Sequence, residues 1–290
     1  MGAWAKTFSV DSVAGRGPGG AICPGGSLCR SGAIRWATLL ALATVAGCSS
    51  AEVERKQVQD KADFHFNLAS GYFHAGNVDL AIRELINALT LDDSHADSRY
   101  LYGFILFGRK RYEEAAEHLR KALQSRPNFF AARNHLGATY LELERWYDAI
   151  VVLEPLLKEP TYTTQYLVYN NLGWAYFKQG DLRLADKHLR MSVFLNPKFC
   201  NGHRNLGLVA AAQRDVRSSI EHFTEAATRC PQYAELHFQR GEALTQDGQT
   251  EAATAAYRKC CQLAGETQLG RRCKGRLGSE VATCDGQEAR

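Results

Sequence analysis

The sequence has few prolines, little net charge and no long hydrophobic run. It contains only 7 prolines among 290 residues, and because proline breaks a helix interior, long stretches of the chain are free to be helical. The formal net charge is +4. Most of that excess lies in the first 47 residues, so the rest of the chain is close to neutral. Nucleic-acid binding needs lysine and arginine clustered on one face, and we therefore expect no nucleic-acid partner.

The sequence also lacks the motifs of catalysis and of metal binding. There is no G-x-S-x-G, H-E-x-x-H or P-loop motif. Gly15, Gly17 and Gly20 match G-x-G-x-x-G, but neither the strand before it nor the helix after it that a dinucleotide site requires is indicated. The 9 histidines are scattered, and the cysteines lack the C-x-x-C spacing of a zinc site. We expect no enzyme, no cofactor and no metal.

The longest apolar run covers residues 36–46, and Arg30 and Arg35 precede it. A membrane-spanning helix needs about 20 apolar residues, whereas a short apolar run behind positive charges is typical of a secretory signal. The run ends in Val45-Ala46-Gly47-Cys48, which resembles the lipobox of bacterial lipoproteins. The resemblance implies that Cys48 is the acylated first residue of the mature chain. An ordinary signal peptide followed by a chance cysteine is the alternative.

The chain from residue 62 onward is an internal repeat. Small residues recur, with spacings of 34, 34, 36, 34 and 34 residues, at Ala69, Gly103, Gly137, Gly173, Gly207 and Gly241. A second small residue follows 12 positions later, and a large apolar residue lies 4 positions beyond it, at Leu85, Leu119, Leu153, Leu189, Phe223 and Tyr257. A 34-residue period with this pattern is typical of the tetratricopeptide repeat (TPR), a helix–turn–helix unit. Two helices cross closely only where side chains are small.

The repeats set the predicted domain organisation. Residues 1–47 are an N-terminal extension with a lipoprotein signal peptide, residues 48–61 a lipidated tether or leading helix, and residues 268–290 a polar, cysteine-containing tail. Between them we expect an all-α TPR solenoid, a right-handed superhelix whose concave face is lined by the first helix of each repeat. The six repeats are 62–95, 96–129, 130–165, 166–199, 200–233 and 234–267.

Three segments in the middle of the chain carry a closer resemblance. Residues 159–164 (EPTYTT), 169–173 (YNNLG) and 196–199 (NPKF) resemble the middle repeats of the PilF/PilW/Tgl family of type IV pilus biogenesis lipoproteins. The resemblance implies a pilotin, which binds the pilus secretin (a PilQ-like subunit) and promotes its localisation and multimer assembly at the outer membrane. It also implies a lipid anchor in that membrane, facing the periplasm, and Ser49 in place of Asp agrees with outer-membrane sorting. A periplasmic TPR scaffold for barrel assembly or cell-wall synthesis is the alternative function.

Groove positions 2, 5, 9, 12 and 13 of each first helix are rich in aromatic residues in repeats 1 and 2. The candidate partner-binding residues are Phe66, Phe73, Tyr100, Phe104 and Phe107, with Asn170, Trp174 and Phe177 in repeat 4. Exposed aromatic residues usually mark partner sites, and a helix or an extended segment would fit such a groove. The alternative is that these rings pack in the core.

Six cysteines follow Cys48, and an even number in an oxidising compartment indicates disulfides. Cys200 begins the first helix of repeat 5 and Cys230 ends its second helix, so an antiparallel pair would bring them together. We expect this disulfide and leave the pairing of Cys260, Cys261, Cys273 and Cys284 open.

Overall fold

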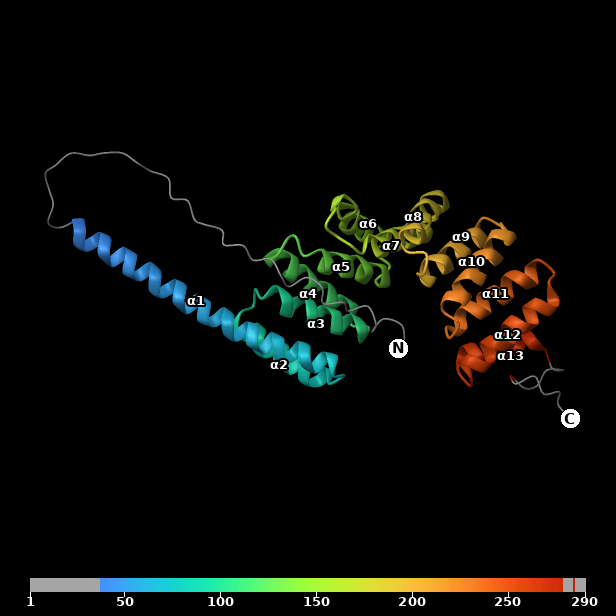
Figure 1. The fold of residues 1–290 in the computed structure, drawn as a ribbon, viewed down its shortest axis with the longest axis horizontal. Coiled ribbons are helices and arrows are strands. Elements are labelled where there is room, and N and C mark those ends of the chain that lie inside the picture. Colours follow the sequence, from blue (N-terminus) through green and yellow to red (C-terminus); the bar gives the residue numbers. More distant parts are fainter. Residues whose placement is uncertain (1–36, 279–283, 285–290) are drawn as a thin grey trace. The chain divides into compact units, whose positions relative to one another are not determined.

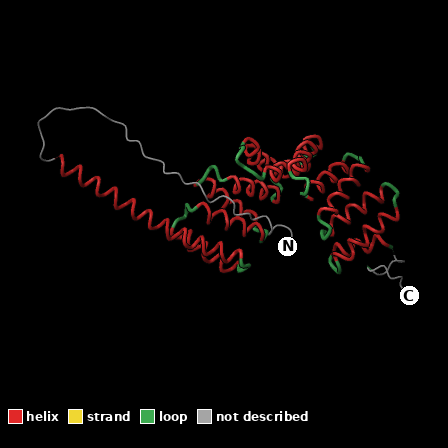
Figure 2. Tube along the Cα trace, in the orientation of Figure 1, coloured by secondary structure: helices red, strands yellow, loops and turns green. Residues whose placement is uncertain are grey.

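The computed structural model describes residues 37–278 and 284, with side chains described from Glu52 onward. Within these residues the chain forms thirteen α-helices and one 3-10 helix, and no strand (Figures 1 and 2). The expected all-α TPR solenoid is confirmed. The chain divides into two units between Val53 and Glu54, and every repeat lies in the second unit. Most of the predicted signal peptide and the side chain of Cys48 lie outside the described residues.

Each repeat contributes a first and a second helix. The first helices are the C-terminal part of α1 (Ala37–His74), α3 (Ala96–Gly108), α5 (Phe130–Glu142), α7 (Gln165–Lys178), α9 (Cys200–Ala212) and α11 (Ala234–Gln246). The second helices are α2 (Val78–Leu91), α4 (Tyr112–Ser125), α6 (Trp146–Leu153), α8 (Leu182–Leu195), α10 (Val216–Arg229) and α12 (Thr250–Ala264). From α3 onward, each second helix packs on the first helix of its own repeat and on that of the next repeat (Figure 1).

Positions are counted from the first residue of each repeat, so that position 8 of the repeat 130–165 is Gly137. The two helices of a repeat approach most closely at the small residue in position 8. A Cβ added at Gly137 would lie 2.4 Å from Leu153 Cγ, and one at Gly207 would lie 2.7 Å from the Phe223 ring. The large residue in position 24 therefore occupies the space that a side chain at position 8 would need. Position 20 is buried in every repeat, and all six large residues at position 24 are buried as well. The small-and-large pattern seen in the sequence is thus the packing rule of the core.

The turn between the two helices needs a residue with a left-handed backbone conformation, that is, a positive φ, at position 15. Glycine supplies it in three repeats, with φ of 79° at Gly76 and 85° at Gly180. In repeat 2 the same position is Lys110, with φ of 60°. The backbone N–H of Arg111 then donates to the Leu106 carbonyl at 2.9 Å, which closes the end of α3 in the manner of a Schellman motif.

Repeat 3 departs from the others in its second helix. Helix α6 ends at Leu153, and the chain continues as a 3-10 helix, η1 (Glu154–Lys158). Pro155 lies in the first turn of η1 and cannot donate a backbone hydrogen bond, which favours the end of the α-helix there. The two additional residues of this repeat are accommodated in the loop at 159–164.

The structure defines both ends of the predicted repeat domain. The segment 48–61 takes the leading-helix alternative, because α1 runs without a break from Ala37 to His74, and its side chains from Glu52 to Lys61 are exposed. The predicted polar tail contains a helix, α13 (Gln268–Leu277). The Thr267 hydroxyl caps it by accepting from the Gly270 N–H at 3.2 Å. α13 packs on α12 and α11.

Three disulfides join the six cysteines that follow Cys48. Cys200 and Cys230 are bonded across repeat 5 with their Cα atoms 6.0 Å apart. Two adjacent cysteines on α12 hold the C-terminal segment: Cys260 bonds Cys273 of α13, and Cys261 bonds Cys284. The Cys260–Cys273 pair that joins α12 to α13 is fully buried, and Leu269 and Leu277 of α13 pack beside it.

The close approach at position 8 predicts a cost for the smallest possible side chain. A Cβ at residue 173 would lie 2.5 Å from Leu189 Cγ, so Gly173→Ala should destabilise the fold by about 1–3 kcal/mol in denaturant unfolding. Gly71→Ala is the matched control, because no atom lies within 4 Å of a Cβ there. It should stabilise α1 by about 0.5–1 kcal/mol. In a Leu189→Ala background the cost of Gly173→Ala should shrink, and an undiminished cost would contradict the packing rule.

Candidate partner-binding groove

The groove aromatics of repeats 1 and 2 form a chain of ring contacts. The Phe73 and Phe104 rings meet edge to face with centroids 5.8 Å apart. Phe104 in turn meets His135 of α5 at 5.0 Å, and Phe66 lies 5.6 Å from His95. Phe107 contacts Tyr112 at the start of α4, with centroids 5.4 Å apart. The four phenylalanines are half-buried, so each packs on a neighbour with one part of its ring and leaves another part accessible.

Tyr100 is not an exposed groove residue. Only 8% of it is accessible, and its ring packs between Phe129 and His135, with centroids 4.8 and 5.5 Å away. Its hydroxyl lies 3.2 Å from His135 Nδ1. Burial raises the pKa of this phenol above its ordinary value. The expectation of an exposed side chain is wrong here because position 5 faces the first helix of the next repeat.

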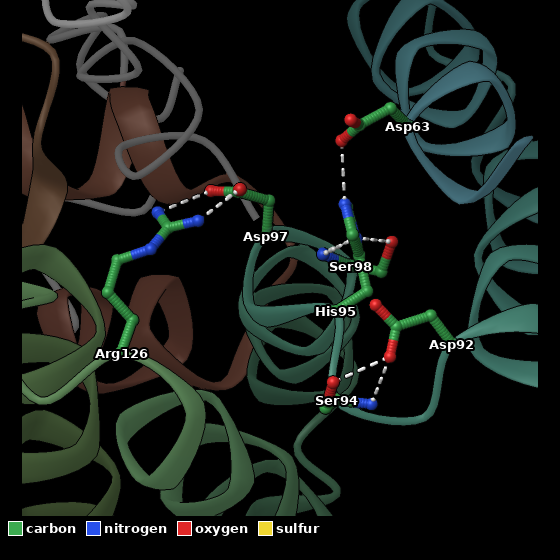
Figure 3. A network of polar contacts seen from close by, with 7 residues as sticks. All are labelled: Asp63, Asp92, Ser94, His95, Asp97, Ser98 and Arg126. Carbon is green, nitrogen blue, oxygen red and sulfur yellow. Dashed lines mark hydrogen bonds and ion pairs between the residues drawn. The ribbon is translucent and has the colours of Figure 1, made fainter. Parts of the chain in front are cut away.

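A polar network lies at one edge of the groove in repeats 1 and 2 (Figure 3). His95 caps α3: its Nδ1 accepts from the Ser98 N–H at 3.2 Å, which leaves Nε2–H to donate to Asp63 Oδ1 at 2.9 Å. Asp97 accepts two hydrogen bonds from the Arg126 guanidinium, at 2.9 and 2.5 Å. Asp63 and Asp97 both occupy groove position 2. Neither aspartate was predicted from the sequence, although their shared repeat position indicates a common place in the groove.

In repeat 4 the predicted residue Asn170 belongs to a ladder of buried amides that joins α5, α7 and α9. Asn205 donates to Asn170 at 2.9 Å, and Asn171 donates to Asn134 at 3.2 Å. Asn170 and Asn171 are themselves adjacent and lie 3.5 Å apart through their amide groups. The expectation that Asn170 presents its side chain to a partner is therefore wrong. Its amide holds neighbouring first helices together.

Trp174 and Phe177 form a second aromatic cluster in the groove. Their rings stack with centroids 5.2 Å apart. The Lys178 ammonium lies 5.1 Å from the Trp174 ring and 5.7 Å from the ring of Trp146 on α6. A cation over an indole face is attracted by the ring quadrupole. Both predicted residues are half-buried, and the structure adds Trp146 and Lys178 to them.

The groove is closed at repeat 6 by the chain itself. The guanidinium of Arg272, on α13, lies 4.2 Å from the centroid of Phe238, which is at groove position 5. Arg276 of the same helix forms an ion pair with Glu242, at groove position 9, with a distance of 2.8 Å. These contacts occupy the positions that a partner would need, so the accessible groove aromatics lie in repeats 1, 2 and 4.

Inside the repeats, position 4 of the first helix faces position 23 of the second, and histidines gather there. His65 contacts Glu84 at 2.8 Å in repeat 1, and Arg99 donates to His118 Nδ1 at 3.2 Å in repeat 2. Burial, then the charge of Arg99, lowers the pKa of His118 to about 4. Burial also lowers the pKa values of His188 and His222, the corresponding residues of repeats 4 and 5. His118, His188 and His222 are therefore neutral in the folded protein at neutral pH.

Neither a membrane span nor a metal site is found among the described residues. In the part of the chain that the structure describes, no helix combines the length and the apolar character that crossing a bilayer requires. Within the same residues, histidine, cysteine, aspartate and glutamate side chains nowhere gather in a group of three that would hold a metal ion.

Known proteins resemble the chain over most of its length. Residues 166–199 and 204–265 match tetratricopeptide-repeat families, and residues 87–156 match the family of subunit 3 of the anaphase-promoting complex, or cyclosome. The type IV pilus assembly protein PilF of Pseudomonas aeruginosa is 26% identical over 214 residues, which are 72% of this chain and 81% of that protein. The chain is therefore similar in sequence to PilF, and its fold is that of the PilF and PilW structures.

Two solved structures share the fold. PilW, described as a widely conserved type IV pilus biogenesis factor, superposes with a TM-score of 0.67 at 20% identity, covering 73% of this chain and 97% of its own. Pseudomonas aeruginosa PilF gives a TM-score of 0.63 at 19% identity, covering 76% of this chain and 99% of its own. The tetratricopeptide repeats that the chain carries are a protein-interaction fold.

The neutral histidines predict loss of stability in acid. A histidine whose pKa is lowered by folding takes up a proton on unfolding, so stability falls as the pH drops below about 6.5. For His118, with a pKa of about 4, the loss between pH 7 and pH 5 should be about 1 kcal/mol, since solvent screens the half-buried ring. His118→Gln keeps an acceptor for Arg99 and removes the titration. The variant should therefore lose about 1 kcal/mol less over this range in denaturant unfolding, and an unchanged pH dependence would contradict the assignment.

Proposed function

We propose that this protein is a pilotin: a lipid-anchored, outer-membrane protein that binds the type IV pilus secretin subunit and promotes its localisation and multimer assembly. The relation to PilF, named a type IV pilus assembly protein, carries the proposal. The likeness in fold to PilW agrees with it. A TPR groove with half-buried aromatics suits a protein partner, because large rings in a desolvated contact contribute much of the binding energy.

The secretin segment binds along the first helices of repeats 1 and 2. Phe66, Phe73, Phe104 and Phe107 offer it an apolar surface that is already held in place by ring contacts. Preorganised side chains lose little conformational entropy when a partner binds. Asp63 and Asp97 at one edge of this surface are held by His95 and Arg126, so the surface offered is apolar and the segment that fits it is apolar. Trp174 and Phe177 extend the contact in repeat 4.

Truncating two of these rings should abolish secretin assembly. Each ring is expected to contribute about 2 kcal/mol, so Phe104→Ala with Phe107→Ala should weaken secretin binding on the order of a thousandfold. The heat-resistant secretin multimer should then be missing from cells that carry the double variant. Tyr233→Ala, which removes a partly exposed ring at the start of α11, is the control and should leave the multimer intact.

Circular dichroism and protein level separate binding from folding in this experiment. Phe104 packs on Phe73 and His135, so its truncation also removes core contacts. The single variant Phe107→Ala avoids this packing and should still weaken binding by about tenfold or more. Wild-type multimer levels in folded Phe104→Ala, Phe107→Ala protein would place secretin binding elsewhere.

The anchor is tested at the mature N-terminus. We expect Cys48 to be the first residue and to carry the lipid, because Val45-Ala46-Gly47-Cys48 resembles a lipobox. Two or more acyl chains give stable membrane attachment. Mass spectrometry should find an acylated N-terminal peptide that begins at Cys48, and Cys48→Ala should release the folded repeats from the membrane. An unmodified peptide that continues through residue 48 would contradict the anchor.

A further inference from the structure

The outer face of α8, the second helix of repeat 4, is apolar where a solenoid is normally polar. Phe194 is 77% exposed, and Met191 and Leu195 beside it are exposed as well. Leu195 also lines a cavity of about 210 Å³. The other residues of that cavity are Pro160, Tyr162, Thr163, Gln165 and Tyr166. Leu195 thus lies where α8 meets the loop that the repeat-3 insertion creates, and the lining of the cavity there is mainly polar.

The other five repeats supply an internal comparison for these positions. Phe194 is at repeat position 29, where the other repeats have Thr90, Gln124, Lys158, Thr228 and Gln262. All five are exposed and polar. Packing does not require an aromatic residue at position 29, since five repeats fold without one. An exposed apolar group that folding does not need indicates a contact with something outside the fold.

The second helix of repeat 3 departs from the other repeats in the same way. On α6, Tyr147 at position 18 is 72% exposed and Val151 at position 22 is also exposed. The corresponding residues of the other repeats are Asp79, Glu113, Arg183, Arg217 and Glu251 at position 18, and Arg83, Glu117, Lys187, Glu221 and Ala255 at position 22. Repeats 3 and 4 thus share an outward apolar character that the adjacent repeats 2 and 5 lack at these positions.

Cations accompany the apolar residues on α8. Arg183 and Lys187 are exposed on this helix, and Lys198 is exposed just after it. The carboxylate on the same helix, Asp186, is held by Arg190 at 2.7 Å. Asp215 and Glu221 of repeat 5 also act on Arg190 and raise its pKa together with Asp186. The cations nearer the start of α8 therefore remain available to an anionic partner.

We infer that this outer face of repeat 4 binds the surface of an anionic phospholipid bilayer. A helix with lysine and arginine around a protruding aromatic and aliphatic group suits the boundary between headgroups and acyl chains. A bilayer also explains why the apolar character spreads over two second helices, since a planar surface contacts more than one. The first helices line the groove and the second helices face outward, so membrane contact here leaves the groove free for a protein.

Vesicle flotation of the full chain tests this inference. The Cys48→Ala protein is used so that no lipid anchor contributes. It should float with vesicles of phosphatidylcholine and phosphatidylglycerol, not with phosphatidylcholine alone, and added salt should weaken the binding. Phe194→Thr installs the residue that repeats 1 and 5 have at position 29, and it should lower the affinity by about tenfold. Lys187→Glu installs the residue of repeats 2 and 5 at position 22, and it should lower the affinity on the order of tenfold.

Matched changes on α2 are the controls. Ile86→Thr removes an exposed apolar side chain, and Arg83→Glu reverses an exposed charge at position 22. Neither should change vesicle binding. Absence of binding to anionic vesicles, or equal losses in the α2 variants, would overturn the inference. So would a photo-crosslinker at position 194 that captures a protein in cells while the purified chain fails to float, because the site would then belong to a protein partner.

Discussion

The structure depends on one contact that every repeat makes: a small residue at position 8 lies against a large residue at position 24. Five repeats use glycine there, and repeat 1 uses Ala69, which is fully buried. The distance between the two helices is fixed by what fits between them, for example Leu153 below Gly137. Because the contact recurs every 34 residues with one interruption of 36, each repeat presents nearly the same surface to the next. Stability in such an array is the sum of repeats and their interfaces.

This contact also divides the first helices into two working faces. One face is committed to the second helix, and the opposite face is left to line the groove. Groove position 5 then lies close to the next first helix, which is why Tyr100 meets His135 and why Asn170 bonds Asn205. Positions 9 and 12 lie further along and keep accessible rings, as at Phe104 and Phe107. A buried side chain at a groove position therefore joins neighbouring repeats, whereas a half-buried side chain remains accessible to a partner.

The sequence predicted what is periodic. Helix pairs and buried positions follow from the 34-residue period, and the proximity of Cys200 to Cys230 follows from where an antiparallel pair begins and ends. A left-handed turn can be predicted from sequence only where the residue is glycine, as at Gly76, because nothing in the identity of Lys110 indicates its positive φ. The amide ladder was missed for a different reason. It depends on the rotation between neighbouring first helices, which no single repeat encodes.

Helix α13 was missed because its burial does not come from hydrophobic periodicity. It contains four cations and two glycines among ten residues, and its buried residues are Gly270, packed against the Gly265 carbonyl, and Cys273, bonded to Cys260. The available signal was Cys273, which lies within α13 and pairs with Cys260 on α12. The pairing could not be predicted, because four cysteines allow three pairings. Covalent attachment here replaces the apolar stripe that a terminal helix would otherwise need.

The closed and open ends of the groove give the repeats different roles. At repeat 6, Arg272 covers Phe238 and Arg276 neutralises Glu242, so the last groove surface is satisfied within the chain. A terminal repeat has no following first helix to pack on, and a capping helix removes the apolar surface that would otherwise promote association. The rings of repeats 1 and 2 have no such cover from α13. Accessible aromatic residues therefore line the groove in repeats 1, 2 and 4, whereas α13 covers the groove residues of repeat 6.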